Sequence, residues 1–170
     1  VGSEMCIRDR TTARLPWLLI GMLGGIGNSM ILGNFDSTFA AHPEMALYIP
    51  LIGGTGGNVG TQSSAIIVQG LANSSLDAKN TFKQVTKEAV VALINATIIS
   101  LLVYTYNFIR FGATATVTYS VSISLFAVVM FASIFGTLVP MTLEKLKIDP
   151  AIATGPFIAI TNDIIGMMLY

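Results

Sequence analysis

The sequence has few of the residues on which most enzymes and metal sites depend. Its 170 residues include one cysteine, Cys6, and one histidine, His42, so a single chain cannot form a disulfide framework, a zinc cluster or a Cys/His nucleophilic pair. Charged residues make up 11% of the chain, compared with about 25% in soluble domains. The net charge of +0 lacks the basic excess of a nucleic-acid-binding protein. These shortages exclude an ordinary soluble enzyme and a nucleic-acid partner.

Apolar residues, in contrast, are abundant, at 53% of the chain with a mean hydropathy of +0.73. Five apolar stretches come close to the ~20 residues that cross a hydrocarbon layer of ~30 Å. The sequence therefore predicts an all-α, polytopic membrane protein with five transmembrane helices in a lipid bilayer. The predicted spans are 15–32, 46–71, 89–109, 119–139 and 151–170, the second interrupted by Pro50 and a glycine cluster and the fourth ending before Pro140.

The first ten residues, VGSEMCIRDR, differ from the rest in composition, because they hold four of the eighteen charges and the only cysteine. We interpret residues 1–10 as a non-native or disordered lead-in and residues 11–170 as one transmembrane domain. A native polar segment is the alternative interpretation of residues 1–10.

The positive charges predict the orientation of the chain in the membrane. Loops on one side carry six of them, and the loops on the other side carry only Arg110. Because cytoplasmic loops are enriched in Lys and Arg, this asymmetry predicts a cytoplasmic N-terminus, with His42 and Glu44 near the outer surface. The six are Arg14, Lys79, Lys83, Lys87, Lys145 and Lys147.

Asp163 is the one charged residue deep inside a predicted span, about 16 Å into the bilayer at a rise of ~1.5 Å per residue. A carboxylate at that depth costs about 2.5 to 3.5 kcal/mol, which favours a role on an ion or proton pathway. The alternative is a hydrogen-bonded aspartate that holds helices together. Gly155 and Ala159 precede Asp163 at intervals of four residues and share its helical face.

One chain supplies too few ligands for an ion at this depth, so we expect a homodimer. Two copies of the face around a two-fold axis would bring two Asp163 carboxylates together. A divalent cation would neutralise the pair, and a hard, hydrated ion such as Mg²⁺ prefers oxygen ligands. The lack of thiolates and imidazoles at this depth argues against softer metals.

The second span combines glycines with polar residues in PLIGGTGGNVGTQSS. It contains no GxxxxGK[ST] or GxGxxG spacing, so it is not a phosphate-binding loop. Its glycines permit close helix contact, and Asn58, Thr61 and Gln62 supply polar groups to a neighbour or a wet cavity. We expect this segment to line a pore or break its helix, with pure packing as the alternative. Gly155 and Asn162 are further candidate pore-lining residues.

Three segments resemble the membrane domain of the MgtE family of magnesium transporters and channels. They are RLPWLL at the first span, PLIGGTGGNVGTQSSAIIVQGLA from Pro50 to Ala72, and GTLVPMTLEKLKIDPAIATGPFIAITNDIIGMMLY from Gly136 to the end. The resemblance implies five membrane helices, a homodimer and a Mg²⁺ pathway between the subunits lined by the second and fifth helices. It also implies that Asp163 binds the hydrated cation and that the backbone carbonyl of Ala159 faces it.

The resemblance also sets the expected location and organisation. It implies a cell membrane, in bacteria the inner membrane. Family members commonly carry cytoplasmic regulatory domains before the membrane domain, and nothing in this sequence corresponds to them, so we expect a fragment or a short member. A polar residue occupies the position of Gly155 in some members.

Magnesium transport is thus the predicted function, with Mg²⁺ as the transported ion and no organic cofactor. A cation exchanger coupled to sodium or protons is one alternative, and a non-conducting membrane anchor or subunit is another. An enzyme is the least favoured class, because no Ser/His/Asp set lies near a membrane face.

Overall fold

A computed structural model describes residues 7–73, 81–112, 115–148 and 150–170 of the chain. Helices account for nearly all of these residues, and no strand occurs among them, which confirms the predicted all-α fold. Residues 1–6 of the expected lead-in, and Lys79 with its charge, lie outside the described residues. The helices are α1 (Ile7–Gly33), α2 (Asp36–Ala41), α3 (Pro43–Ala46), α4 (Ile49–Ala72), α5 (Thr81–Phe111), α6 (Thr116–Lys145) and α7 (Pro150–Leu169).

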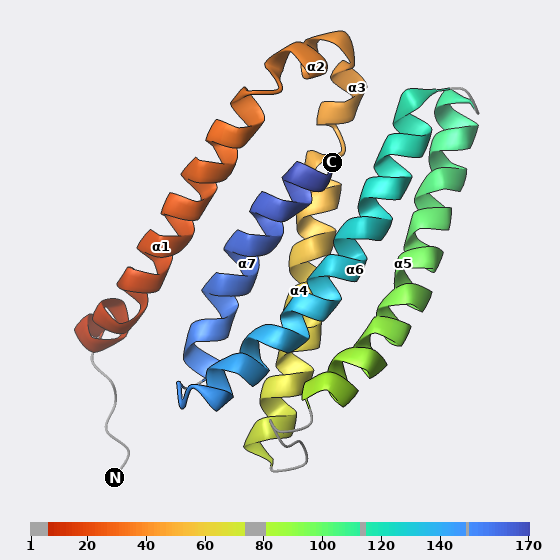
Figure 1. Ribbon diagram of the computed structural model, residues 1–170. Helices are drawn as coiled ribbons and strands as arrows, with labels where there is room; N and C mark the ends of the chain where they lie inside the picture. The colour runs from red at the N-terminus through yellow and green to blue at the C-terminus, as the bar shows by residue number, and fades with distance from the viewer. Residues whose placement is uncertain (1–6, 74–80, 113–114, 149) are drawn as a thin grey trace.

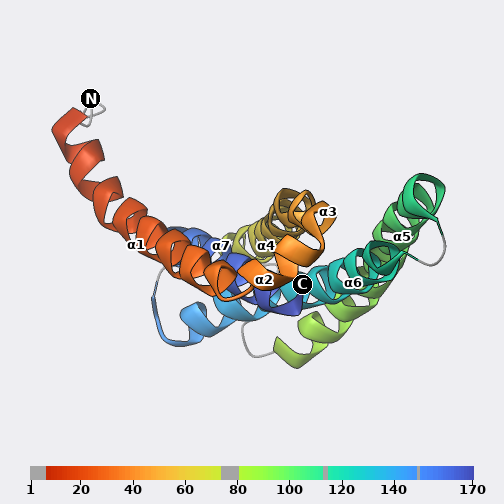
Figure 2. The same cartoon turned by 90° about the horizontal axis from the view of Figure 1, so that it is seen from above.

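The five long helices form an open arc (Figures 1 and 2). Helix α6 lies at its centre and packs against α4, α5 and α7, while α1 packs against α7 at one end of the arc. The apolar core sits between these helices and includes Ile52, Leu125 and Val128. The arc therefore places α4 and α7 side by side.

Helix α4 excludes one of the two roles expected for its glycine cluster, and helix α6 extends beyond one predicted end. Helix α4 is continuous across its glycine cluster, so the cluster does not break the helix. Pro50 lies in the first turn of α4, where a missing N–H group leaves no helical hydrogen bond unmade. Helix α6 continues past Pro140 to Lys145, which overturns the predicted end before Pro140; this interior proline is buried among neighbouring helices, and such packing lets membrane helices tolerate it.

Two helices begin earlier than the apolar pattern predicts. Helix α1 starts at Ile7, eight residues before the predicted span, and α5 starts at Thr81, eight residues before Ala89. Hydropathy marks the part of a helix that suits hydrocarbon, whereas the backbone hydrogen bonds continue into polar turns beyond it.

Within the part of the chain that the structure describes, three helical segments are long and apolar enough to cross a membrane: Arg14–Gly33 of α1, α5 and α6. The apolar stretch Phe157–Leu169 of α7 is shorter. Large apolar side chains such as Leu18, Leu102 and Ile109 are exposed, as expected where lipid rather than water surrounds a helix. The total of five spans and the side of the N-terminus stay predictions.

The region predicted as an outer loop contains the two short helices α2 and α3, which lie beside the C-terminus (Figure 1). Two tyrosine hydrogen bonds, the first buried and the second partly buried, stabilise this end of the molecule. Tyr48 donates to Oδ1 of Asn107 on α5 at 2.5 Å, and Tyr170 donates to the carbonyl of Met45 at 2.5 Å. The ends of α4, α5 and α7 are thereby held to the α3 segment.

Candidate cation site on helices α4 and α7

Helices α4 and α7 run antiparallel in a single, well-defined register. Ile158 and Asn162 approach Gly60, Asn162 also lies beside Gly56, and Gly166 contacts Ile52. Each step of four residues along α7 is matched by a step of four back along α4, as expected of two helices that pack along one face. This register determines which residues of α4 lie beside Asp163.

Glycines let the backbones approach closely around this pair. A Cβ atom at Gly136 of α6 would lie 2.5 Å from the carbonyl oxygen of Gly60, and one at Gly56 would lie 2.8 Å from Cγ1 of Val128. Such distances leave no room for a methyl group without movement of the helices. Gly56 and Gly60 are therefore packing positions toward α6 and α7, as expected for a small-xxx-small pair.

Asp163 lies at the edge of this contact. Its Oδ1 would lie 3.8 Å from a Cβ atom placed on Gly53, and the residue is only partly buried. Within the described part of the chain, its carboxylate has no hydrogen-bond or ion-pair partner. Ala159 and Gly155, one and two turns earlier, are exposed. The carboxylate therefore stands at the end of an open face of α7.

The polar residues of α4 lie on a second open face. Asn58, Thr61 and Gln62 are all exposed, and their spacing of three and four residues places them together on one side of the helix. The hydroxyl of Thr61 donates to the carbonyls of Gly57 and Asn58 at 2.8 and 3.0 Å. Its proton is thus used within α4, and only its oxygen lone pairs are available to water or an ion.

Asn162 has a different position from the other candidates. Its side chain is only 1% exposed, and its Nδ2 donates to the carbonyl oxygen of Gly56 at 3.1 Å. It therefore faces the interior between α7 and α4, whereas a pore-lining residue would face the open side. The hydrogen bond links the two helices one residue before Asp163.

Glu88 is a polar contact that the sequence pattern missed. Its Oε1 accepts a 2.6 Å hydrogen bond from the hydroxyl of Ser63 on α4. Ser133 of α6 lies 3.3 Å from the same hydroxyl, and both serines are buried. The available signal was a carboxylate directly before the apolar stretch that begins at Ala89.

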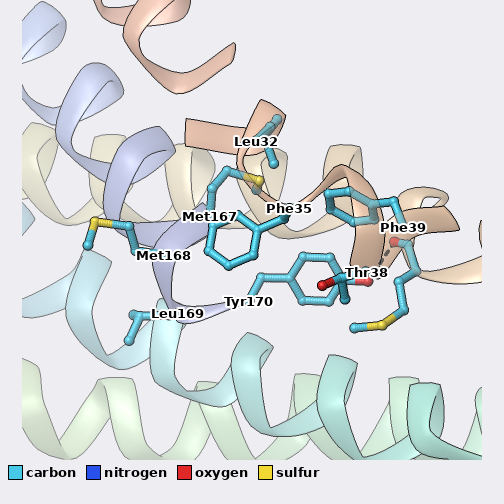
Figure 3. A pocket seen from close by; sticks show the side chains of 9 residues that line it. Leu32, Phe35, Thr38, Phe39, Met167, Met168, Leu169 and Tyr170 are labelled. Atoms are coloured by element: carbon cyan, nitrogen blue, oxygen red, sulfur yellow. Dashed lines mark hydrogen bonds between the residues drawn. The ribbon is translucent and has the colours of Figure 1, made fainter. Parts of the chain in front are cut away.

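No group of three or more His, Cys, Asp or Glu side chains that could hold a metal occurs among the described residues. A cavity of about 280 Å³ lies elsewhere, between the end of α1, the α2–α3 segment and the end of α7 (Figure 3). Its lining is aromatic and aliphatic apart from Thr38, which does not suit a hard cation. The cavity residues are Leu32, Phe35, Thr38, Phe39, Met45, Met167, Met168, Leu169 and Tyr170.

A helical chain with apolar spans and a lone carboxylate at an open interhelical face defines a multi-pass membrane protein rather than a soluble metal-binding domain. The sequence model of MgtE, described as "Divalent cation transporter", matches residues 49–170. The chain belongs to this family, which confirms the resemblance seen in its motifs. The family is one of transporters rather than enzymes.

Curated relatives agree with this assignment. The chain is 34% identical over 158 residues to a protein of Thermus thermophilus named magnesium transporter MgtE, and 32% identical over 157 residues to a protein of the same name from Bacillus subtilis. These alignments cover 93% and 92% of this chain. The chain spans about 35% of the length of either relative.

Proposed function

We propose that this chain forms the membrane-embedded pathway of a magnesium transport protein in the cell membrane, with Asp163 binding the hydrated ion near the bilayer midplane. The observation that carries the proposal is the position of the Asp163 carboxylate at the edge of exposed faces of α4 and α7. No hydrogen-bond or ion-pair partner of this carboxylate occurs among the described residues. Family membership and the two magnesium transporters that the chain resembles support Mg²⁺ as the ion. A hydrated Mg²⁺ suits carboxylate and carbonyl oxygens.

The working unit in this proposal is a homodimer. A single arc of helices leaves the α4 and α7 faces open (Figure 2), and one Asp163 gives a hydrated divalent ion one carboxylate. A two-fold axis beside α7 would supply a second carboxylate and a second Ala159 carbonyl. Asn58, Thr61 and Gln62 of both copies would then face the same hydrated path.

The test is Mg²⁺ uptake into proteoliposomes under an imposed membrane potential, for the wild type and Asp163→Asn. The substitution keeps the side chain's size and removes its charge, so the ion loses its main electrostatic partner. We expect wild-type uptake to be lost by a factor of at least ~100, since two uncompensated ligands of a divalent ion are removed from one dimer. Asp36→Asn, an exposed aspartate on α2, is the matched control and should leave uptake unchanged.

Each alternative function has its own signature in this assay. Uptake that survives in Asp163→Asn would contradict the proposed role of the carboxylate. Uptake that requires a sodium or proton gradient would establish a coupled exchanger instead of a conducting pathway. Absence of uptake in both proteins, although both insert and dimerise, would favour the non-conducting anchor.

A further inference from the structure

Asn162 is the buried polar side chain nearest in sequence to the proposed ion ligand, and its surroundings are built around it. A Cβ atom placed on Gly60 would clash with the Asn162 amide. A Cβ atom placed on Gly56 would lie 3.9 Å from the Cβ of Asn162. Two glycines one turn apart on α4 thus leave room for this one side chain. Its amide enters the space and reaches the backbone of α4.

The hydrogen bond specifies how the amide is oriented. The Gly56 carbonyl can only accept, so the Nδ2 group of Asn162 must face it. No hydrogen-bond partner of Oδ1 occurs among the described residues. A leucine has the same branching and number of side-chain heavy atoms and no unpaired polar atom, so packing alone does not explain an asparagine at this position.

The consequence of the bond falls on the next residue. Successive residues of a helix are separated by ~100° and 1.5 Å, so a bond that locks the rotation and height of Asn162 also locks those of Asp163. The same register places the Asp163 carboxylate beside Gly53, one turn along α4 from Gly56. A rotation of α7 by a fraction of a turn would carry the carboxylate away from the open face.

From this arrangement we infer that Asn162 is a positioning residue: its hydrogen bond to the Gly56 carbonyl holds α7 in the register that points Asp163 at the ion path. The inference rests on the proposed function of Asp163. It assigns to Asn162 no contact with the ion, in contrast to a pore-lining role.

The test compares Asn162→Leu with the wild type in the proteoliposome assay over a range of Mg²⁺ concentrations. Leucine keeps the branching and the number of side-chain heavy atoms and removes the donor. We expect the half-saturating Mg²⁺ concentration to rise about fivefold, the effect of one lost hydrogen bond of ordinary net strength. A purely structural role would lower the amount of folded protein and the maximal uptake without changing the half-saturating concentration.

Asn107→Leu is the matched control. Asn107 is also fully buried and bound to one partner, Tyr48, but it lies on α5 at the junction with the start of α4. We expect this variant to unfold at a lower temperature and to keep the wild-type half-saturating concentration. An equal shift in both variants would overturn the inference, because a shift would then report general loosening.

A second measurement covers the case in which Asn162→Leu folds too poorly for transport. The more conservative Asn162→Ser and the wild type are melted in detergent with increasing Mg²⁺, since a ligand that binds the folded state raises the melting temperature according to its affinity. We expect Asn162→Ser to need about five times more Mg²⁺ than the wild type for the same increase. The positioning role alone would be overturned if the melting temperature of Asn162→Ser rose with Mg²⁺ as in the wild type while that of Asp163→Asn did not rise. Unchanged Mg²⁺ dependence in Asp163→Asn would instead overturn the proposed function.

Discussion

At the scale of single residues, the polar side chains of this protein differ in whether they form a hydrogen bond to another helix. Asn162 and Glu88 reach across to α4, whereas Asp163 has no described partner. A bonded polar group in a membrane interior adds specificity to helix packing, and an unbonded carboxylate is costly unless an ion or a proton uses it. The two classes look alike in the sequence, because both are isolated polar residues near apolar ones.

Glu88 gives the prediction at this scale. In Glu88→Leu the buried hydroxyl of Ser63 loses its carboxylate acceptor, which should lower the free energy of unfolding by about 1 to 3 kcal/mol. Glu88→Gln keeps an acceptor oxygen and should cost less than about 1 kcal/mol. Unfolding in a denaturing detergent, followed by circular dichroism, measures both. Glu144→Leu, at an exposed position of α6, is the control; equal losses at both positions would argue against the hydrogen-bonded cluster.

At the scale of elements, glycines determine how near α4 comes to α6 and α7. The glycines of α4 fall into two groups that the sequence does not distinguish. Gly56 and Gly60 face other helices at distances too short for a methyl group, whereas Gly54 and Gly57 have open space around the position of a Cβ atom. Close approach of the backbones is what places the carbonyl of Gly56 within reach of Asn162.

A pair of glycine substitutions tests this division. Gly136→Ala places a Cβ atom against the backbone of Gly60, which a side-chain rotation cannot relieve, so we expect a loss of about 1 to 3 kcal/mol in the free energy of unfolding. Gly54→Ala adds the same methyl group in open space on an exposed position and should be neutral or slightly stabilising. Thermal melting of the two variants in one detergent compares them. A stable Gly136→Ala would mean that α4 and α6 are farther apart.

At the scale of the whole molecule, the open arc leaves one face of α7 and one face of α4 without a neighbour. Exposed apolar side chains on α1 and α5 suit lipid, but the exposed side-chain amides of Asn58 and Gln62 on α4 do not, because transfer of an amide from water to hydrocarbon is costly. The homodimer proposed above would cover these faces and hydrate them.

Cross-linking tests this arrangement. In a Cys6→Ser background, Ala159→Cys should form a covalent dimer with a short thiol cross-linker, because the two-fold axis would bring two exposed α7 faces together. Ile94→Cys, at a position on α5 that is also exposed, should stay monomeric under the same conditions. Gel electrophoresis of membranes treated with the cross-linker separates the products. A dimer from Ile94→Cys and none from Ala159→Cys would place the axis on the other end of the arc.

Much of the fold could be predicted from local properties of the chain. Hydropathy predicts the long helices in the right order, and Asp163 stands out because a charge inside an apolar stretch is improbable without a use. The errors concern helix ends and the course of the chain through Pro50 and Pro140, where neighbouring turns and helices decide whether a helix starts, ends or continues.

Sequence by itself determined the class of this protein: a helical membrane protein of the MgtE family with one anomalous carboxylate. Only the tertiary structure decided that Asn162 faces α4, that Glu88 bonds Ser63, and that Gly56 packs while Gly54 is open. The physical reason is that hydropathy sums over neighbours in the chain, whereas the face that a helix buries depends on partners such as Gly56 and Asn162, which lie 106 residues apart.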